Sequence, residues 1–449
     1  MRYLSTRGDP ERSGFAQVLL EGLAPDGGLY VPEAWPSFTD PSAATYPDLV
    51  TSTLGAFTEP DFAGTDLEAL VAEAYRDFTH PQVAPLRQVS DTHYLLELIF
   101  GPTRSFKDYA LVVLSRLFDA ELARQGRRIL VLGATSGDTG SAAMAACRGR
   151  QNIEVVILYP EGKISEIQRR QMTTIPDANV RAVGVEGTFD DCQALVKRAF
   201  NDRSLELPLA AINSINWARI AVQAAYYLWA ARQVAAPVTF AVPTGNFGNA
   251  FAAFVARQMG APISRIVVAN NRNHGLFTLI DSGELPVEPV QSTVAPAMDI
   301  QLPSNLERYL FFLTGQDPTR VTGLLAQLAS ENRLVLHPQE HGLMKELFAG
   351  GWIDDTEVLA VIDRVETSEG LLLDPHTAIA WEVGKRLQPS EGSLVTIATA
   401  HPAKFGETIL AATGRRPALP AELASLSERE ERLATIPNDY PALLDLLSS

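Results

Sequence analysis

One lysine of this chain lies at a point where a reactive amine could be held. Residues 101–111 read GPTRSFKDYAL, so Lys107 lies between a phenylalanine and an aspartate, just ahead of an apolar run. A surface charge at the start of a helix is one interpretation. The apolar residues 94–100 precede it and read as a buried strand. Because α/β sheets bind ligands at the ends of their strands, Lys107 is also a candidate for chemistry.

A first glycine-rich turn, VLGATSGDTGSAA at residues 131–143, follows a predicted strand and opens a predicted helix. Backbone amides at a helix N-terminus, together with hydroxyl donors, suit a carboxylate or a phosphate. The spacing is one residue too long for GxGxxG, and the lysine of a phosphate loop is missing. A structural turn is the alternative, but it would not need so many hydroxyls, which belong to Thr135, Ser136, Thr139 and Ser141.

A second turn, AVPTGNFGNAFAAF at residues 241–254, has the same strand–turn–helix pattern. Its glycines let the backbone approach an anion, and the free amides of the helix start would point at that anion. With no lysine close by in sequence, the helix dipole and the amides would bind it. Two anion-binding turns and one isolated lysine together suit a phosphorylated cofactor that forms an imine with lysine, namely pyridoxal phosphate.

The elements that must position these residues alternate between strands and helices. This alternation predicts an α/β fold with two three-layer α/β/α domains, mostly parallel sheets and an N-terminal, mainly helical region. We expect that region at residues 1–95, a smaller domain with Lys107 at 96–230, and a larger domain at 231–449. The tail, residues 418–449, reads as helical and peripheral. The predicted strands are 94–100, 128–134, 154–160, 180–185, 238–243, 265–270 and 393–399.

Composition excludes several classes of function. The formal charge of 37 − 53 = −16 argues against a nucleic-acid binder, which needs clustered Lys and Arg. Two cysteines, Cys147 and Cys192, are too few for a disulfide framework. No signal peptide or membrane-spanning run is seen, so we expect a cytoplasmic protein. His337 and His341 could share a helix face, but no third ligand is evident and no metal is expected.

Eight blocks in this order and spacing resemble threonine synthase, in its long form, from residue 2 to about residue 410. They are STRG, GPTRSFKD, GATSGDTGSAA, EGKISEIQRRQM, NSINWARI, PTGNFGNAFA, DPHTAIA and TAHPAKF. The resemblance implies the second structural class of pyridoxal-phosphate enzymes, related to the tryptophan synthase β chain. It also implies O-phospho-L-homoserine as substrate, L-threonine and phosphate as products, and a monomer or homodimer.

The resemblance also assigns roles to residues. Lys107 matches the Schiff-base lysine of the family, which also acts as the base at the substrate Cα. Asp138 lies near the 3′ oxygen of the cofactor, and Thr399 faces its pyridine nitrogen. The cofactor-phosphate loop is Gly245, Asn246, Phe247, Gly248 and Asn249. The resemblance assigns binding of the substrate carboxylate to Thr135, Ser136 and Thr139. The resemblance assigns binding of the substrate phosphate to Asn213, Ser214 and Arg219, with Lys163 and Ser165 as weaker candidates.

Some residues near Lys107 depart from the pattern of the family. Phe100 replaces a more usual histidine, and Arg104 with Ser105 replaces an apolar–small pair, which bears on substrate preference. His376 and His401 are expected to support the site rather than to catalyse. Two alternatives stay open: a phospholyase acting on a related phosphorylated amino acid, and a non-catalytic binding protein of the same fold.

Overall fold

The computed structural model describes residues 1–38, 43–135, 137–202, 208–210 and 214–447. The chain forms two units, and each is built from two separate stretches. The first unit contains Met1–Phe100 and Ser214–Pro417, and the second contains Gly101–Asn213 and Ala418–Ser449. The three consecutive domains expected from the sequence do not coincide with these units, because the N-terminal region and residues 214–230 belong to the first unit and the tail to the second.

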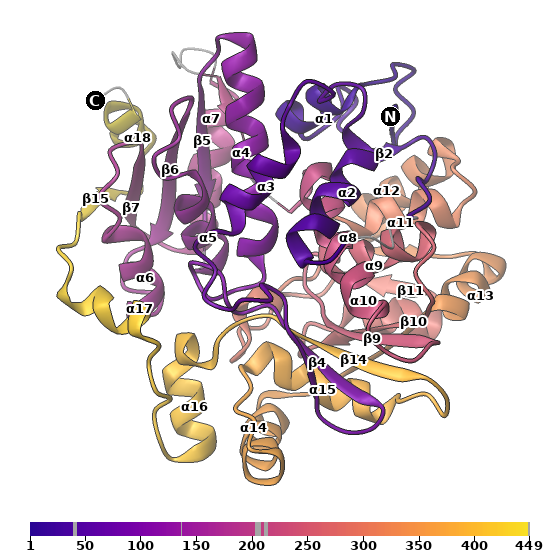
Figure 1. Cartoon of the computed structure of the whole chain (residues 1–449). Helices are drawn as coiled ribbons and strands as arrows, with labels where there is room; N and C mark the ends of the chain where they lie inside the picture. Colours follow the sequence, from indigo (N-terminus) through magenta and orange to yellow (C-terminus); the bar gives the residue numbers. More distant parts are fainter. Residues whose placement is uncertain (39–42, 136, 203–207, 211–213, 448–449) are drawn as a thin grey trace. The chain divides into compact units, whose positions relative to one another are not determined.

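The first unit is built on a six-stranded sheet with the strand order β13-β10-β9-β14-β4-β3 (Figure 1). All neighbouring pairs are parallel except β3 with β4. The strands β9 and β14 are buried at every position, as expected for a sheet covered on both faces. The bounds are β13 Phe348–Trp352, β10 Ile263–Asn270, β9 Val238–Pro243, β14 Ser393–Ala398, β4 His93–Glu97 and β3 Leu86–Gln88.

Helices cover both faces of this sheet. On one face Phe240 of β9 packs edge-on against Tyr227 of α8 (Trp217–Ala231), with ring centroids 4.8 Å apart. The next helix on the chain, α9 (Gly248–Gln258), packs against α8 and against β9 and β10. On the other face Ala241 belongs to an apolar cluster with α14 (Asp355–Glu369) and α15 (Pro375–Arg386). The first unit is therefore a three-layer α/β/α structure.

The N-terminal region adds three helices and a hairpin to the first unit. The helices are α1 (Phe15–Glu21), α2 (Tyr46–Thr58) and α3 (Leu67–Tyr75), and the hairpin pairs β1 (Tyr3–Ser5) with β2 (Tyr30–Pro32). Further elements follow β10 and β14. They are α10 Gly275–Ser282, β11 Glu284–Pro286, α11 Leu306–Leu313, α12 Pro318–Glu331, β12 Arg333–Val335, α13 Pro338–Leu347 and α16 Gly406–Thr413.

The second unit contains a five-stranded, fully parallel sheet with the order β15-β7-β6-β5-β8. Val156 and Leu158 of β6 share an apolar cluster with residues of α7 and α18, whereas Ile157 faces Gly140 of α5. The alternation along β6 therefore places helices on both faces of this sheet as well. The bounds are α4 Lys107–Gln125, β5 Ile129–Ala134, α5 Asp138–Cys147, β6 Ile153–Pro160, α6 Glu166–Thr173, β7 Val180–Glu186, α7 Phe189–Phe200, β8 Leu209–Ala210, α17 Ala421–Ala424, β15 Ala434–Pro437 and α18 Tyr440–Leu447.

The tail, expected to be helical and peripheral, contains the helices α17 and α18 but also a strand. Strand β15 pairs with β7 at one edge of the five-stranded sheet, so the tail completes that sheet. Ile436, Tyr440 and Leu443 are buried in the apolar cluster against α7. Four residues, ATIP, are too short for a periodic signal, and only the pairing with β7 makes them a strand.

The predicted α/β class, with two three-layer units and an N-terminal helical region, is confirmed. Among the described residues, no helix combines the length and the apolar character needed to cross a membrane.

Candidate active site

Lys107 is the first residue of α4, and it is buried rather than displayed on the surface. The residue is 7% exposed, and its Nζ lies 3.5 Å from Oδ2 of Asp138 at the start of α5. The Phe106 ring lies under the same ammonium, 4.8 Å from Nζ to the ring centroid. A buried amine has to be held by charge or hydrogen bonds, so its position is specified by the fold.

A chain of hydrogen bonds fixes Asp138 in turn. Its Oδ1 accepts a 3.0 Å bond from Nε2 of Gln168 in α6. Ser165 is the N-cap of α6: its Oγ accepts from the Gln168 backbone N–H at 3.2 Å and also contacts Gln168 Oε1 at 3.1 Å. The hydroxyl of Ser165 therefore acts on Lys107 through Gln168 and Asp138. Lys163 is exposed.

The hydroxyl-rich turn before α5 uses two of its hydroxyls internally: Ser141 donates to backbone carbonyls of the turn, and Thr135 makes three bonds within it. Oγ1 of Thr135 accepts from the backbone N–H groups of Gly137 (3.0 Å) and Gly140 (2.9 Å) and donates to the Gly137 carbonyl (3.2 Å). A hydroxyl can donate one hydrogen bond and accept two, so the Thr135 hydroxyl has no free position left. Thr139 is partly exposed, and Ser136 lies outside the described residues.

The two glycines of this turn cannot be replaced without rearrangement. Gly137 has φ +148°, and a Cβ there would lie 2.4 Å from Gln168 Nε2. At Gly140 an added Cβ would lie 2.5 Å from Thr135 Cγ2. The glycines therefore allow the turn to close tightly over Thr135 and against α6.

In the first unit, the turn between β9 and α9 leads directly into the N-terminus of α9. Phe247 has a left-handed backbone, φ +63°, at the N-cap of α9, and no side chain caps that helix. A Cβ added at Gly245 would lie 2.6 Å from the carbonyl oxygen of Ala297. The first amides of α9 therefore lack a side-chain acceptor from the cap residue, which is the arrangement that receives an anion.

Asn249 Nδ2 and Arg219 Nη1 are among the buried side-chain nitrogens of the first unit that have no hydrogen-bond partner among the described residues. Oδ1 of Asn249 accepts from the hydroxyls of Tyr226 (2.5 Å) and Tyr227 (2.7 Å), which leaves the buried Nδ2 as an unpartnered donor. Nη1 of Arg219 in α8 is likewise buried without a partner. Burial lowers the pKa of Arg219 to about 10, a shift that the nearby Tyr226 partly offsets.

Buried donors without acceptors are costly unless a ligand supplies the acceptor. The open amides of α9, Asn249 Nδ2 and Arg219 Nη1 therefore fit groups rich in anionic oxygen, as a cofactor phosphate and a substrate phosphate would be. Ser214 is described and partly exposed, whereas Asn213 lies outside the described residues. The Tyr226–Tyr227 pair is buried and also orients Asn249.

Thr399, which directly follows β14, is buried and held by its backbone. Its N–H donates to Oγ1 of Thr377 at 3.1 Å, and the Thr377 hydroxyl donates to Oδ2 of Asp374. The other oxygen of Asp374 accepts from the backbone N–H of His376 (3.0 Å) and from its Nδ1 (2.8 Å). These bonds place the Thr399 hydroxyl at a defined point beyond the end of β14.

The tautomer of His376 follows from its two partners. Nδ1 donates to Asp374, and Nε2 accepts from the backbone N–H of Ala297 at 3.3 Å. The same Ala297 carries the carbonyl that approaches Gly245. His376 therefore supports the site through the Ala297 backbone, and His401 caps the short helix after it by accepting from the Ala403 N–H at 3.1 Å.

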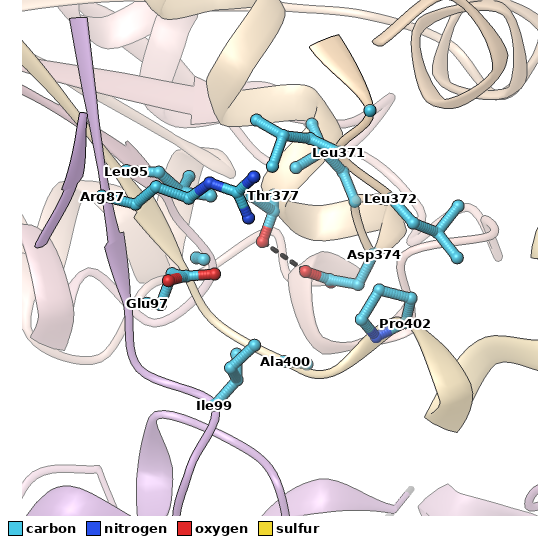
Figure 2. Close-up of a pocket in the computed structure, with 13 residues that line it drawn as sticks. Arg87, Leu95, Glu97, Ile99, Leu371, Leu372, Asp374, Thr377, Ala400 and Pro402 are labelled. Carbon is cyan, nitrogen blue, oxygen red and sulfur yellow. Dashed lines mark hydrogen bonds between the residues drawn. The ribbon is translucent and has the colours of Figure 1, made fainter. Parts of the chain in front are cut away.

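A small pocket of about 100 Å³ lies beside the Asp374–Thr377 pair (Figure 2). Figure 2 shows the carboxylate of Glu97 and the guanidinium of Arg87 pointing into it. Burial raises the pKa of Glu97, and the charge of Arg87 partly counteracts this. The pocket therefore places two ionisable side chains beside the hydrogen bonds that hold Thr399.

The unusual neighbours of Lys107 have identifiable partners. Arg104 adopts a left-handed backbone, φ +61°, and donates from Nη2 to Glu422 of α17 at 2.6 Å. Ser105 is fully buried, with its Oγ 3.4 Å from Thr103 Oγ1. The Phe100 ring packs on His80, with centroids 4.8 Å apart. Arg104 thus ties the lysine turn to the C-terminal segment of its own unit.

Sequence reasoning missed the residues that act behind the site, namely Gln168, Asp374 and Thr377. Gln168 had a detectable signal, since SEIQ is a capping box, but nothing local showed that its side chain reaches Asp138. Asp374 precedes a proline at a helix start and reads as an N-cap. The contact of Asp374 with Thr377 can therefore be predicted from the sequence, whereas the hydrogen bond from the Thr399 N–H to Thr377 cannot.

Comparison with known proteins gives three family matches. The model for pyridoxal-phosphate dependent enzymes matches residues 84–323, the threonine synthase N terminus matches 2–75 and the threonine synthase C-terminal model matches 377–446. The threonine synthase of Pseudomonas aeruginosa is 44% identical over 98% of this chain and 96% of its own length.

Solved structures that are similar over the whole chain include two threonine synthases. The pyridoxal-phosphate-bound threonine synthase of Brucella melitensis has a TM-score of 0.97 at 42% identity, covering 100% of this chain and 98% of its own. The yeast threonine synthase has a TM-score of 0.94 at 33% identity, with the same coverage.

Proposed function

The chain belongs to the threonine synthase family of pyridoxal-phosphate-dependent enzymes, and on that basis we propose that it converts O-phospho-L-homoserine and water to L-threonine and phosphate. In this reaction the bond between Cγ and the phosphate oxygen breaks, and phosphate leaves. A water molecule forms the new C–O bond at Cβ. The proton lost from Cα is returned, Cβ loses one proton, and Cγ gains one to become the methyl carbon of threonine, while the remaining proton of the water goes to the phosphate.

The observation that carries the choice of substrate is the buried guanidinium of Arg219. Its pKa is lowered to about 10 by burial, so it is still protonated at neutral pH, and Nη1 has no partner among the described residues. A planar cation of this kind is suited to binding phosphate oxygens and to stabilising the charge on a leaving phosphate. We assign Asn213 and Ser214 to the same group, with Lys163 and Ser165 as weaker candidates.

The remaining roles are part of the same proposal. Lys107 would take and return the proton at the substrate Cα, and Asp138, which holds its amine, would lie near the 3′ oxygen of the cofactor. Pyridoxal phosphate, when bound, supplies a carbonyl that reacts with amines and a ring that accepts electrons. Thr399 offers a neutral hydroxyl to the ring nitrogen. Residues 245–249 bind the cofactor phosphate through amides and Asn249 Nδ2.

The substrate carboxylate is assigned to the turn before α5. The Thr135 hydroxyl is fully used within that turn, so Thr135 would shape it, or would contact the carboxylate only by giving up one of its bonds. Thr139, Ser136 and the amides at the start of α5 are the donors that we expect to contact the carboxylate. We also propose a cytoplasmic enzyme that acts as a monomer or homodimer, and sedimentation analysis would distinguish the two states.

Product analysis tests the proposal. The purified holoenzyme is incubated with O-phospho-L-homoserine, and threonine, phosphate and 2-oxobutyrate are measured together. Threonine and phosphate in equal amounts are expected. Phosphate with 2-oxobutyrate would instead indicate the phospholyase, and no turnover with any phosphorylated amino acid would indicate a binding protein.

A further inference from the structure

The STRG segment near the N-terminus carries no role in the proposed chemistry, yet it is tied to the interior of the first unit. Thr6 Oγ1 donates to Glu307 Oε1 at 2.5 Å. Arg7 makes a two-pronged contact with the same carboxylate, from Nε to Oε1 (3.0 Å) and from Nη2 to Oε2 (2.8 Å). Glu307 lies in the first turn of α11, directly before Arg308. The N-terminal hairpin is therefore anchored on α11.

Arg308 is fully buried, and the oxygens to which it donates within the described residues are all uncharged. Nε donates to the carbonyl of Tyr30 (2.9 Å), Nη2 to the carbonyl of Ile215 (2.5 Å) and Nη1 to Oδ1 of Asn305 (2.5 Å). Burial lowers the pKa of Arg308 to about 9. Burying a guanidinium away from water is costly, so a purely structural contact would be met more cheaply by an uncharged side chain. A rigid planar fork, however, holds three separate segments at fixed positions.

Asn305, which is held by Arg308, in turn binds the backbone of two loops of the proposed site. Because its Oδ1 accepts from Arg308, its Nδ2 is the donor, and it bonds the carbonyls of Ser214 (2.9 Å) and Asn246 (3.2 Å). The Asn305 backbone N–H also donates to the Asn246 carbonyl, at 3.1 Å. The neighbouring Ser304 hydroxyl bonds Asn246 Oδ1 at 3.1 Å.

We infer that Asn305 and Arg308 are positioning residues that couple the cofactor-phosphate loop to the segment assigned to the substrate phosphate, with the N-terminal hairpin as their outer anchor. Asn246 lies in the first loop, and Ser214 and Ile215 lie in the second, just before the helix that carries Arg219. Neither positioning residue is assigned to either phosphate. The part concerning Ser214 rests on the proposed function, whereas the part concerning Asn246 rests only on the cofactor.

The test uses the full-length protein with Asn305→Asp, which keeps an acceptor for Arg308 but removes the donor to both carbonyls. The dissociation constants of pyridoxal phosphate and of pyridoxal, which lacks the phosphate, are measured by equilibrium dialysis. We expect the constant for pyridoxal phosphate to rise about tenfold, equivalent to about 1.4 kcal/mol. The constant for pyridoxal should change less than about twofold, since the lost bond to the Asn246 carbonyl lies behind the loop that binds the phosphate, which pyridoxal lacks.

Arg308→Gln is the second variant, expected to act in the same direction. Arg320→Gln is the matched control. Arg320 makes a two-pronged contact with Glu340 in the same unit (2.9 and 2.8 Å), and neither of these bonds reaches either loop. The inference would be overturned if Asn305→Asp and Arg308→Gln both kept the wild-type affinity for pyridoxal phosphate. It would also be overturned if the affinities for pyridoxal and for pyridoxal phosphate fell by the same factor. If the affinity for pyridoxal phosphate falls but the inhibition constant of inorganic phosphate against substrate does not rise, the coupling to the Ser214 segment is refuted. A proposed function that fails on product analysis leaves the dialysis result unaffected.

Discussion

Replacing Thr377 by valine isolates the hydrogen bonds that hold Thr399. The change keeps the shape of the side chain but removes the donor to Asp374 and the acceptor of the Thr399 N–H, all of which are buried. A buried group left unpaired costs about 1–3 kcal/mol, and a bond to a charged group is worth about 1.5–3 kcal/mol. Asp374 keeps its two bonds from His376, so we expect a loss of about 3 kcal/mol in the free energy of unfolding.

The chain offers a matched control in Thr239→Val. Thr239 is also fully buried, but its hydroxyl has no hydrogen-bond partner among the described residues. Removing an unpaired buried hydroxyl is expected to leave stability unchanged or to raise it by about 1 kcal/mol. The same chemical change should therefore give opposite signs at the two positions.

Urea unfolding followed by tryptophan fluorescence measures both variants in the relevant part of the chain. All five tryptophans lie in the first unit, at positions 35, 217, 229, 352 and 381, so the signal reports the unit that contains both threonines. Midpoints are compared at unchanged m-value. If the two variants differ by less than about 0.5 kcal/mol, within the range of ordinary surface substitutions, the assigned network does not hold Thr399.

Three further predictions concern the cofactor, the substrate and pH. Lys107→Ala should lose both turnover and the visible absorbance of the lysine-linked cofactor while still binding pyridoxal phosphate; full turnover would remove Lys107 from its role. Arg219→Lys, which replaces the planar fork by a point charge, should raise KM for the phosphorylated substrate at least about tenfold, and an unchanged KM would reassign the phosphate. Burial, with a smaller effect of Lys385, lowers the pKa of His93 to about 4, so stability should fall as pH drops from about 6.5 to about 4. The loss should be about 2–3 kcal/mol, and His93→Gln should flatten it; an unchanged pH slope in that variant contradicts the assignment.

The local parts of the structure were predictable because local chemistry determines them. The two strand–turn–helix junctions at Gly137 and Gly245 were found from glycines and apolar runs, and Lys107 from its place between a strand and a helix. The resemblance to threonine synthase then supplied roles that spacing alone leaves open. The boundaries of the units were not predictable, because β15 finds its partner β7 about 250 residues earlier in the chain.

The residues behind the site illustrate the same limit. Arg308 and Asn305 lie on no motif, and their importance arises from contacts with Tyr30, Ile215 and Asn246, which are far away in sequence. A buried arginine looks like a surface arginine in a sequence. Only the fold shows that water is excluded and that its donors are all directed at backbone or amide oxygens.

The two glycine turns show which sequence signal for anion binding deserves more weight. The turn before α5 is rich in hydroxyls, but the Thr135 hydroxyl closes the turn itself and has no bonding capacity left. The turn before α9 contributes no hydroxyl of its own between Gly245 and Asn249, yet it leads to an uncapped helix start and an unpartnered Asn249 Nδ2. A hydroxyl count therefore overstates what the first turn can offer a ligand. A helix that starts at glycine after a left-handed residue, without Ser, Thr or Asp at its N-cap, leaves its amides for an external acceptor. On that argument the second turn should bind phosphate through its backbone, and a capping side chain at position 247 should weaken binding by competing for the same amides, in addition to the loss of the Phe247 ring contacts with Tyr309 and Phe348.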